Sequence, residues 1–399
     1  MEEDTKYILL QSGGKSIAYN DNDCFVNGLK KSKEEGDNRN SKQTAEDLKK
    51  RFYAEFFRTH YKNLVILTAA GTSLDNGDGK GKTRDELWNF CENEINAFKE
   101  EIAGIENKDF FSGKDIEGLL SYIILYGKIA EAKKKTTIDE LKKKLEEKIK
   151  NACDLQLDKS VPSPHKTFLD KITARKPSDP RVQLFTTNYD TLFEQAANEG
   201  GFIVIDGFSF THPREFSGSY FDYDIVHREK TRIKQEESFV SKVLQLYKLH
   251  GSLNWERVSD ARIIQKEKTD SPLIIYPASE KYESSYEQPY FEMMSRFQQV
   301  LRKEETLLIV IGFGFQDKHI QNVIIEAVAQ NPGFHLVIVN YNGNEKIETM
   351  HLEQFFECVE KMEVKRKVTI LFDTFSEFTK NYPENKTYIK RDNNDTIQP

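Results

Sequence analysis

The sequence lacks close pairs of cysteines. Its four cysteines, Cys24, Cys91, Cys153 and Cys358, are far apart and form no Cys-x-x-Cys motif. Structural zinc sites usually take their ligands from such pairs. We therefore expect no metal site, and we expect ordinary reduced thiols, as is usual for cytosolic proteins.

Long apolar runs and an excess of positive charge are also missing. No run approaches the roughly 18 apolar residues that span a bilayer. The first residues, Met-Glu-Glu-Asp, lack the basic and apolar regions of a signal peptide. These absences predict a cytoplasmic protein without membrane contact. The formal net charge of -7 argues against a chain that binds nucleic acid by charge alone.

A lysine-rich segment between residues 133 and 144 is the one candidate for a basic patch. The interleaved Glu140, Glu146 and Glu147 favour a solvated helix face instead. Direct nucleic-acid binding is therefore not expected.

Short β-branched and apolar runs alternate with helical patterns along most of the chain. The strand-like runs lie at residues 64–68, 182–187, 202–205, 244–249, 307–311 and 336–339. This alternation predicts an α/β fold, a Rossmann-like doubly wound parallel sheet. We expect residues 61–345 to form this domain, with a helical insertion at about 85–180. Residues 1–60 would be an N-terminal extension that is a possible oligomer contact, and 346–399 a C-terminal extension with a polar tail.

Several local patterns add expectations that a structure can test. Residues 87–98 are typical of one amphipathic helix, and Thr137-x-x-Glu140 resembles a capping box that starts another. Residues 207–240 show no clear period and are expected to be a long loop. A strand is predicted at 272–276, a helix at 350–359 and a strand at 368–372.

Polar and small residues follow successive strands. In an open α/β sheet, ligands bind outside the carboxyl ends of the strands, where these residues would meet. They are the turn 69–73, Asn188 and Asp190, His250, Gly312 and Gly314, and Asn340. Each signal is weak by itself, because Asn188 could simply cap a helix and His250 could be a satisfied strand-end histidine. Their order along the chain favours a nucleotide-binding crevice.

Gly79-Lys-Gly-Lys-Thr83 resembles the end of a phosphate-binding P-loop. The P-loop pattern requires a glycine where this chain has Asn76, and the loop should begin at the end of the strand. An ATPase is therefore disfavoured.

The ordered motifs resemble the NAD-binding core of the sirtuin family. They are the turn from Ala69 to Ser73, Thr186-Thr-Asn-Tyr-Asp190, the His250-Gly pair, the glycine-rich turn from Gly312, and the strand that ends in Asn340. Their spelling is similar to that of bacterial sirtuin-like proteins of anti-phage defence, which hydrolyse NAD to nicotinamide and ADP-ribose. The resemblance covers about residues 61–345.

The resemblance implies a set of site residues. Asn188 would hold a water or a ribose hydroxyl, His250 would act as general base, and Asp190 would hold the ribose or position Asn188. The residues implied to bind NAD are Ala69, Ala70, Gly71, Thr72, Ser73, Asp75, Thr187, Gly312, Phe313, Gly314, Asp317 and Asn340. No metal cofactor is implied, and NAD would be the substrate.

The chain departs from the family pattern in three ways. Ala69 stands where the turn usually begins with glycine, and Gly314 stands where relatives often carry serine. Deacylating sirtuins usually carry a cysteine-paired zinc ribbon, which this chain lacks. The missing zinc ribbon favours NAD hydrolysis over deacylation.

The resemblance also implies a biological setting. NAD depletion would halt the infected cell in abortive infection. A HerA-type hexameric ATPase and DNA translocase is the implied partner, with a short Argonaute-type protein as the alternative, and a homo-oligomer is expected. A module that senses NAD or ADP-ribose without turnover remains the alternative function. A partner-dependent nuclease is disfavoured, because no persuasive carboxylate cluster is visible.

Overall fold

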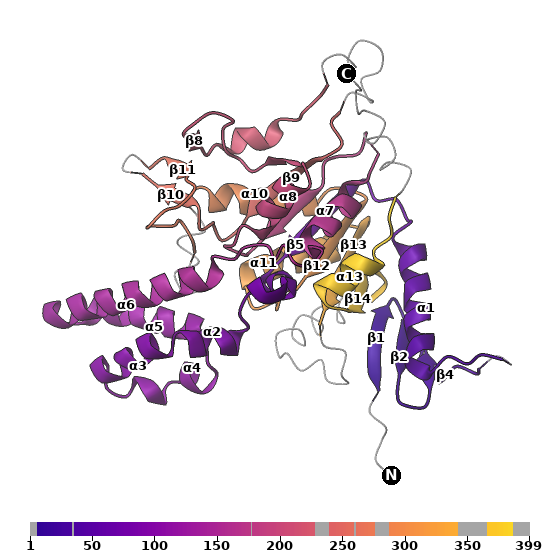
Figure 1. The fold of residues 1–399 in the computed structure, drawn as a ribbon, viewed down its shortest axis with the longest axis horizontal. Coiled ribbons are helices and arrows are strands. Elements are labelled where there is room, and N and C mark those ends of the chain that lie inside the picture. Colours follow the sequence, from indigo (N-terminus) through magenta and orange to yellow (C-terminus); the bar gives the residue numbers. More distant parts are fainter. Residues whose placement is uncertain are drawn as a thin grey trace.

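The structure is a computed structural model that describes residues 6–33, 36–176, 178–227, 239–258, 261–275, 287–341 and 365–385. Within these ranges its centre is an eleven-stranded mixed sheet (Figure 1). In chain order the strands are β1 (Tyr7–Ser12), β2 (Lys15–Tyr19), β3 (Cys24–Val26), β4 (Leu29–Lys30), β5 (Asn63–Thr68), β6 (Gln183–Thr186), β7 (Ile203–Ile205), β9 (Val243–Lys248), β12 (Thr306–Ile311), β13 (Phe334–Asn340) and β14 (Val368–Phe372). Their spatial order is β4-β3-β2-β1-β14-β13-β12-β5-β6-β9-β7.

The middle of the sheet is parallel and buried on both faces. Every residue of β5 and β12 is buried, as expected for strands that helices cover from both sides. The register pairs Ile311 with both Thr68 and Val339, and Thr68 with Thr186. The carboxyl ends of these strands therefore lie level at one edge. The predicted α/β Rossmann-like fold is confirmed.

Helices cover both faces of this sheet. On one face, α10 (Tyr290–Leu301) and α11 (Lys318–Gln330) bury Phe297 and Ile324 against the strands. On the other face, α1 (Ser41–Phe56), α7 (Pro164–Thr173), α8 (Leu192–Glu199) and α13 (Phe375–Asn381) enclose a second core that contains Tyr53, Phe168 and Phe378. Each face of the sheet thus has its own apolar core.

The two ends of the described chain extend the same sheet. Strand β14 continues the parallel part beside β13, pairing Phe372 with Asn340. Strand β1 then joins β14 antiparallel, pairing Leu10 with Leu371, and β2 to β4 follow as a meander. The predicted strand at 368–372 is confirmed. The proposed domain boundaries stay a prediction.

The helical insertion forms a layer of its own beside the sheet (Figure 1). It contains α2 (Arg84–Phe90), α3 (Glu92–Glu101), α4 (Asp109–Ser112), α5 (Ile116–Ile129) and α6 (Ala132–Cys153). Its core is separate and includes Phe98, Leu120 and Leu145. The insertion therefore folds around its own apolar residues.

Two expectations about the insertion are wrong. The helix predicted through residues 87–98 breaks at Cys91 into α2 and α3. The capping box predicted at Thr137 is absent, because α6 already begins at Ala132. Lysines are good helix formers, so the run 133–135 extends the helix upstream of Thr137. The capping box found here joins Thr83 to Glu86.

The region after β7 also differs from expectation. The predicted loop at 207–240 contributes β8 (Arg214–Glu215), which joins β10 (Trp255–Arg257) and β11 (Ile263–Gln265) in a small sheet that the sequence did not predict. The strand predicted at 272–276 is reduced to one isolated bridge between Gly251 and Ile274, and residue 276 lies outside the described residues. The predicted helix at 350–359 also lies outside them. Among the described residues, no helix is both long and apolar enough to cross a membrane.

The buried side chain of His165 makes the free energy of unfolding depend on pH. It is fully buried beside Phe193 and Phe375, and neither ring nitrogen has a hydrogen-bond partner within the described residues. Burial lowers the pKa of His165 from 6.5 to about 3. Between these pH values the unfolded chain binds a proton that the folded chain does not, so stability is lost as pH falls from 6.5 towards 3, by about 3–5 kcal/mol.

We expect His165→Leu to flatten this pH dependence. Urea unfolding of wild type and variant at several pH values between 4 and 7 measures it. The matched control is His227→Leu, because His227 is exposed. An unchanged slope in His165→Leu would contradict the assignment.

Candidate functional site

Two glycine turns touch at the carboxyl edge of the sheet. The turn after β5 is a 3-10 helix, Ala70–Asp75, in which Gly71 N donates to Gly312 O at 3.2 Å. A Cβ on Gly71 would lie 2.5 Å from Gly312 Cα, and one on Gly312 would lie 2.6 Å from Gly71 Cα. Gly312 also has a φ of +65°, which favours glycine. Both glycines are thus required by the contact between the turns after β5 and β12.

Asn188 ties the end of β6 to the first of these turns. Its Nδ2 lies 3.1 Å from Ala69 O, 3.2 Å from Thr72 Oγ1 and 2.9 Å from Ser73 Oγ. The alternative that Asn188 caps the following helix is wrong, because it is Asp190 Oδ1 that accepts from Leu192 N, at 3.1 Å. The amide nitrogen of Asn188 is therefore committed to the turn.

Asp190 is a buried carboxylate that shares a partner with Asn188. It is 7% exposed, and Ser73 Oγ donates to its Oδ2 at 2.7 Å. Burial raises the pKa of Asp190, while the Lys248 ammonium and the bonds from Ser73 and Leu192 N act against that rise. Ser73 therefore links Asn188 and Asp190 in one network.

Lys248 supports this network through the backbone oxygen of Asp190, and it was not predicted from the sequence. This lysine is 2% exposed, and its Nζ donates to the backbone oxygen of Asp190 and, at 2.9 Å, to Glu194 Oε1. Its signal in the sequence is a single charged residue in the otherwise apolar end of β9. A buried charge needs such partners.

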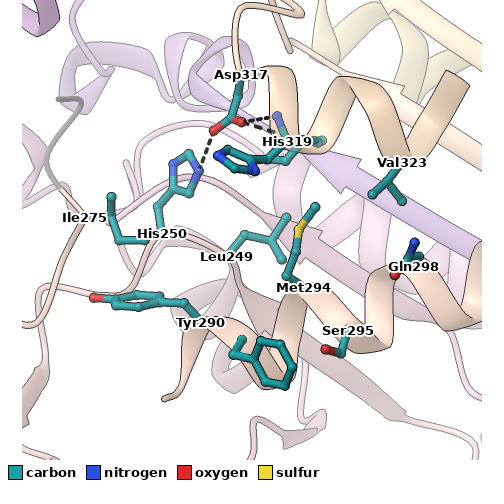
Figure 2. A pocket seen from close by; sticks show the side chains of 12 residues that line it. Leu249, His250, Ile275, Tyr290, Met294, Ser295, Gln298, Asp317, His319 and Val323 are labelled. Carbon is teal, nitrogen blue, oxygen red and sulfur yellow. Dashed lines mark hydrogen bonds and ion pairs between the residues drawn. The ribbon is translucent and has the colours of Figure 1, made fainter. Parts of the chain in front are cut away.

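His250 meets an acidic partner from a different strand end. Its Nε2 lies 3.1 Å from Asp317 Oδ2, and Figure 2 shows the two side chains facing each other. Asp317 is fixed because its Oδ1 caps α11, accepting from His319 N at 3.0 Å and Ile320 N at 3.4 Å. A neutral imidazole that donates through Nε2 keeps Nδ1 as an acceptor. Asp317 thus orients the ring of His250.

Most of these groups line a cavity of about 290 Å³, whereas Gly71, Thr72 and Lys248 lie outside its wall. The predicted site residues on its wall are Ala69, Ala70, Ser73, Thr187, Asn188, Asp190, His250, Gly312, Phe313, Gly314 and Asp317. The sequence analysis missed the part of the wall that comes from the insertion, namely Leu87, Ile116, Ile149, Ala152 and Cys153. Burial raises the pKa of the Cys153 thiol to about 12, so this cysteine is no thiolate nucleophile at neutral pH.

The other predicted binding residues do not line this cavity. Gly71 makes the contact between turns, and Thr72 Oγ1 donates to Ala69 O at 2.9 Å inside the first turn. Asp75 Oδ2 accepts from Ser376 N at 2.7 Å, and Asn340 O accepts from Asp373 N at 3.0 Å. Their binding roles stay predictions. Within the described part of the chain, no group of three or more His, Cys, Asp or Glu is placed to hold a metal ion.

A family comparison matches this region. Residues 182–359 match the SIR2-like domain family. The matched stretch contains Asn188, Asp190, His250 and Asp317, whereas the turn after β5 lies before it. No curated protein matches the chain. SIR2-like domains bind NAD and include deacylases and NADases, so the match supports a sirtuin-like family with an NAD-related activity.

The buried side chain of Lys248 yields a stability prediction. Lys248→Met would leave Glu194 and the carbonyl of Asp190 without their cation, so we expect the free energy of unfolding to fall by about 3–5 kcal/mol. Lys242→Met is the matched control, because Lys242 is 42% exposed and pairs with Asp170 at 3.6 Å. Its loss should stay below about 1 kcal/mol. Urea unfolding at pH 7 measures both, and equal losses would argue against a supporting role for Lys248.

Proposed function

We propose that this chain is an NAD+ hydrolase that cleaves the nicotinamide–ribose bond and releases nicotinamide and ADP-ribose. The observation that carries the proposal is the shared cavity, in which the oriented His250 and the oriented Asn188 face the same space beside the turn after β5. A module that only binds NAD has no need of an oriented base.

Cleavage of an N-glycosidic bond passes through an oxocarbenium-like state that water then captures. Asn188 Oδ1 accepts a hydrogen bond from the attacking water or from a ribose hydroxyl. His250 takes the proton of that water through the ring nitrogen that Asp317 does not hold. The Asp317 carboxylate then stabilises the imidazolium, as a carboxylate does for the histidine of a catalytic triad.

The backbone of the two touching turns suits the diphosphate. Ala69 and Ala70 put only small side chains on the cavity wall, and Gly314 leaves its part of the wall without a side chain, so a diphosphate can approach the backbone closely there. The apolar residues of the insertion cover the opposite wall. Such a cover lowers the local dielectric and strengthens the hydrogen bonds made by Asn188 and His250.

The lack of paired cysteines in the sequence favours hydrolysis over deacylation. Deacylating sirtuins usually carry a cysteine-paired zinc ribbon, and the four cysteines here form no pair in the sequence. Water is then the acceptor that the site supplies.

The biological role that we propose is that of an anti-phage effector that depletes NAD. Its support is the similarity of Thr186-Thr-Asn-Tyr-Asp190 and the His250-Gly pair to defence proteins of the sirtuin type. The same similarity supports control by a HerA-type ATPase, with a short Argonaute-type protein as the alternative partner, and assembly as a homo-oligomer.

Substitution of the two oriented side chains tests the hydrolase directly. We expect Asn188→Ala and His250→Ala each to lower kcat/KM for NAD by at least about 100-fold, the usual scale for loss of a general base. The matched control is His227→Ala, on the surface. Nicotinamide and ADP-ribose are followed by chromatography, with and without a co-purified ATPase. Turnover that survives both changes would refute the assignment, and NAD binding without turnover in every state would favour the sensor.

Substitution of Asp317 tests whether this residue orients His250 or only stabilises the fold. Asp317→Asn keeps an acceptor at the N-cap of α11, so Tm should change little. The amide can instead hold the wrong tautomer of His250, and we expect kcat to fall by at least about tenfold with little change in KM. Steady-state kinetics and thermal unfolding measure the two effects. A large drop in Tm with an unchanged kcat would show that Asp317 acts only as a cap.

A further inference from the structure

A second cavity lies at the same edge of the sheet, beyond β13. Its volume is about 600 Å³, and it shares no lining residue with the cavity beside His250. Phe372, the last residue of β14, and Tyr341, which follows β13, form part of its wall, while α1 and α13 flank it. This is again the carboxyl edge of a parallel sheet, where α/β folds bind ligands.

Four lysines line this second cavity, namely Lys42, Lys49 and Lys50 from α1 and Lys380 from α13. Lys49 is only 5% exposed, and its Nζ donates to Asp373 Oδ1 and to Phe372 O, both at 2.7 Å. An ammonium has three N–H donors, so the two bonds to described residues leave the third donor for a ligand.

The cavity is lined by three carboxylates, Glu46, Asp373 and Glu377, beside its four lysines, and Glu46 pairs with Lys42 at 4.0 Å. Asp373 accepts from Lys49 and Tyr53, and Glu377 accepts from Thr374 N at 3.0 Å in a capping box. Lys50 and Lys380 are exposed and form no ion pair with a described residue. The wall therefore carries a small excess of positive charge, with the exposed Lys50 and Lys380 near the buried ammonium of Lys49.

Aromatic rings stand on the same wall. Tyr7 and Tyr19 both line the cavity, and their rings are stacked with centroids 5.2 Å apart and planes inclined by 24°. Tyr7 is 36% exposed. A flat aromatic face beside ammonium groups matches a molecule that combines a planar base with phosphate.

Helix α13 connects this cavity to the candidate active site. Its N-cap, Thr374, lines the second cavity. Two residues on, Ser376 N donates to Asp75 Oδ2 at 2.7 Å, and Asp75 ends the turn after β5. A ligand that shifts α13 therefore acts on the turn that holds Asn188.

We propose that the second cavity is a regulatory site for a nucleotide, with its phosphates on Lys49, Lys50 and Lys380, and that its occupancy changes NAD affinity through α13. The coupling rests on NAD binding at the proposed active site, which NAD titration without any other nucleotide tests separately.

The binding test uses the full chain with His250→Ala, so that NAD is not consumed during a titration. ATP and ADP-ribose are titrated separately by calorimetry, with inorganic phosphate as a third arm. We expect a nucleotide site whose Kd rises at least about tenfold in Lys50→Ala/Lys380→Ala, the scale of lost charged hydrogen bonds. The control pair Lys133→Ala/Lys135→Ala, on the exposed face of α6, should leave that Kd unchanged.

Preference for ATP would indicate regulation by a signal other than the product, and preference for ADP-ribose would indicate feedback by the product. Either result supports the site. Binding of phosphate alone, or nucleotide binding that does not depend on Lys50 and Lys380, overturns it.

The coupling test measures NAD affinity with and without saturating nucleotide. We expect a change of about fivefold or more, which disappears in Lys50→Ala/Lys380→Ala. A change that persists in that variant would show competition at the first cavity, and it would overturn the coupling.

Discussion

The contact between Gly71 and Gly312 is the constraint on which the site depends. It brings the turns after β5 and β12 together backbone to backbone, at a distance that no Cβ fits. Asn188 can reach three atoms of the first turn because that turn is held against the second. His250 meets Asp317 because the second turn leads directly into α11. A side chain at either glycine would separate the half of the cavity that contains Asn188 from the half that contains His250.

The two halves are held in different ways. Asn188, Ser73, Asp190 and Lys248 form a buried chain of hydrogen bonds in which each group has more than one partner. Such networks are rigid, because breaking one bond leaves a buried polar group unsatisfied. His250 has one carboxylate partner, at the cap of a helix that lies at the sheet edge. The rigid half suits positioning of the sugar, and the histidine half suits a group that must gain and lose a proton.

Much of this was predictable because it is local. A strand followed by a small or polar residue places that residue at the sheet edge whatever the rest of the chain does, so Asn188, His250 and Gly312 could be identified from the sequence. The apolar wall made by Ile116 and Ile149 could not, because it depends on how the insertion packs over the sheet. Nor could the contact between Asp317 and His250, because it joins the ends of two strands that lie far apart in the sequence. The capping box predicted at Thr137 is absent for a related reason. A capping pattern inside a run of good helix formers does not interrupt the helix.

The second cavity contains a buried ion pair between Lys49 and Asp373. This pair joins α1 to the end of β14, and so connects the two ends of the described chain. Replacement of a buried ion pair by apolar residues is often neutral or stabilising, so stability alone gives little reason to place one here. The cores on both faces of the sheet are amply apolar without it. The ammonium of Lys49 lies at the sheet edge among further lysines, and its bonds to described residues use two of its three N–H donors. A phosphate bound in this cavity would explain why a buried charge is placed there.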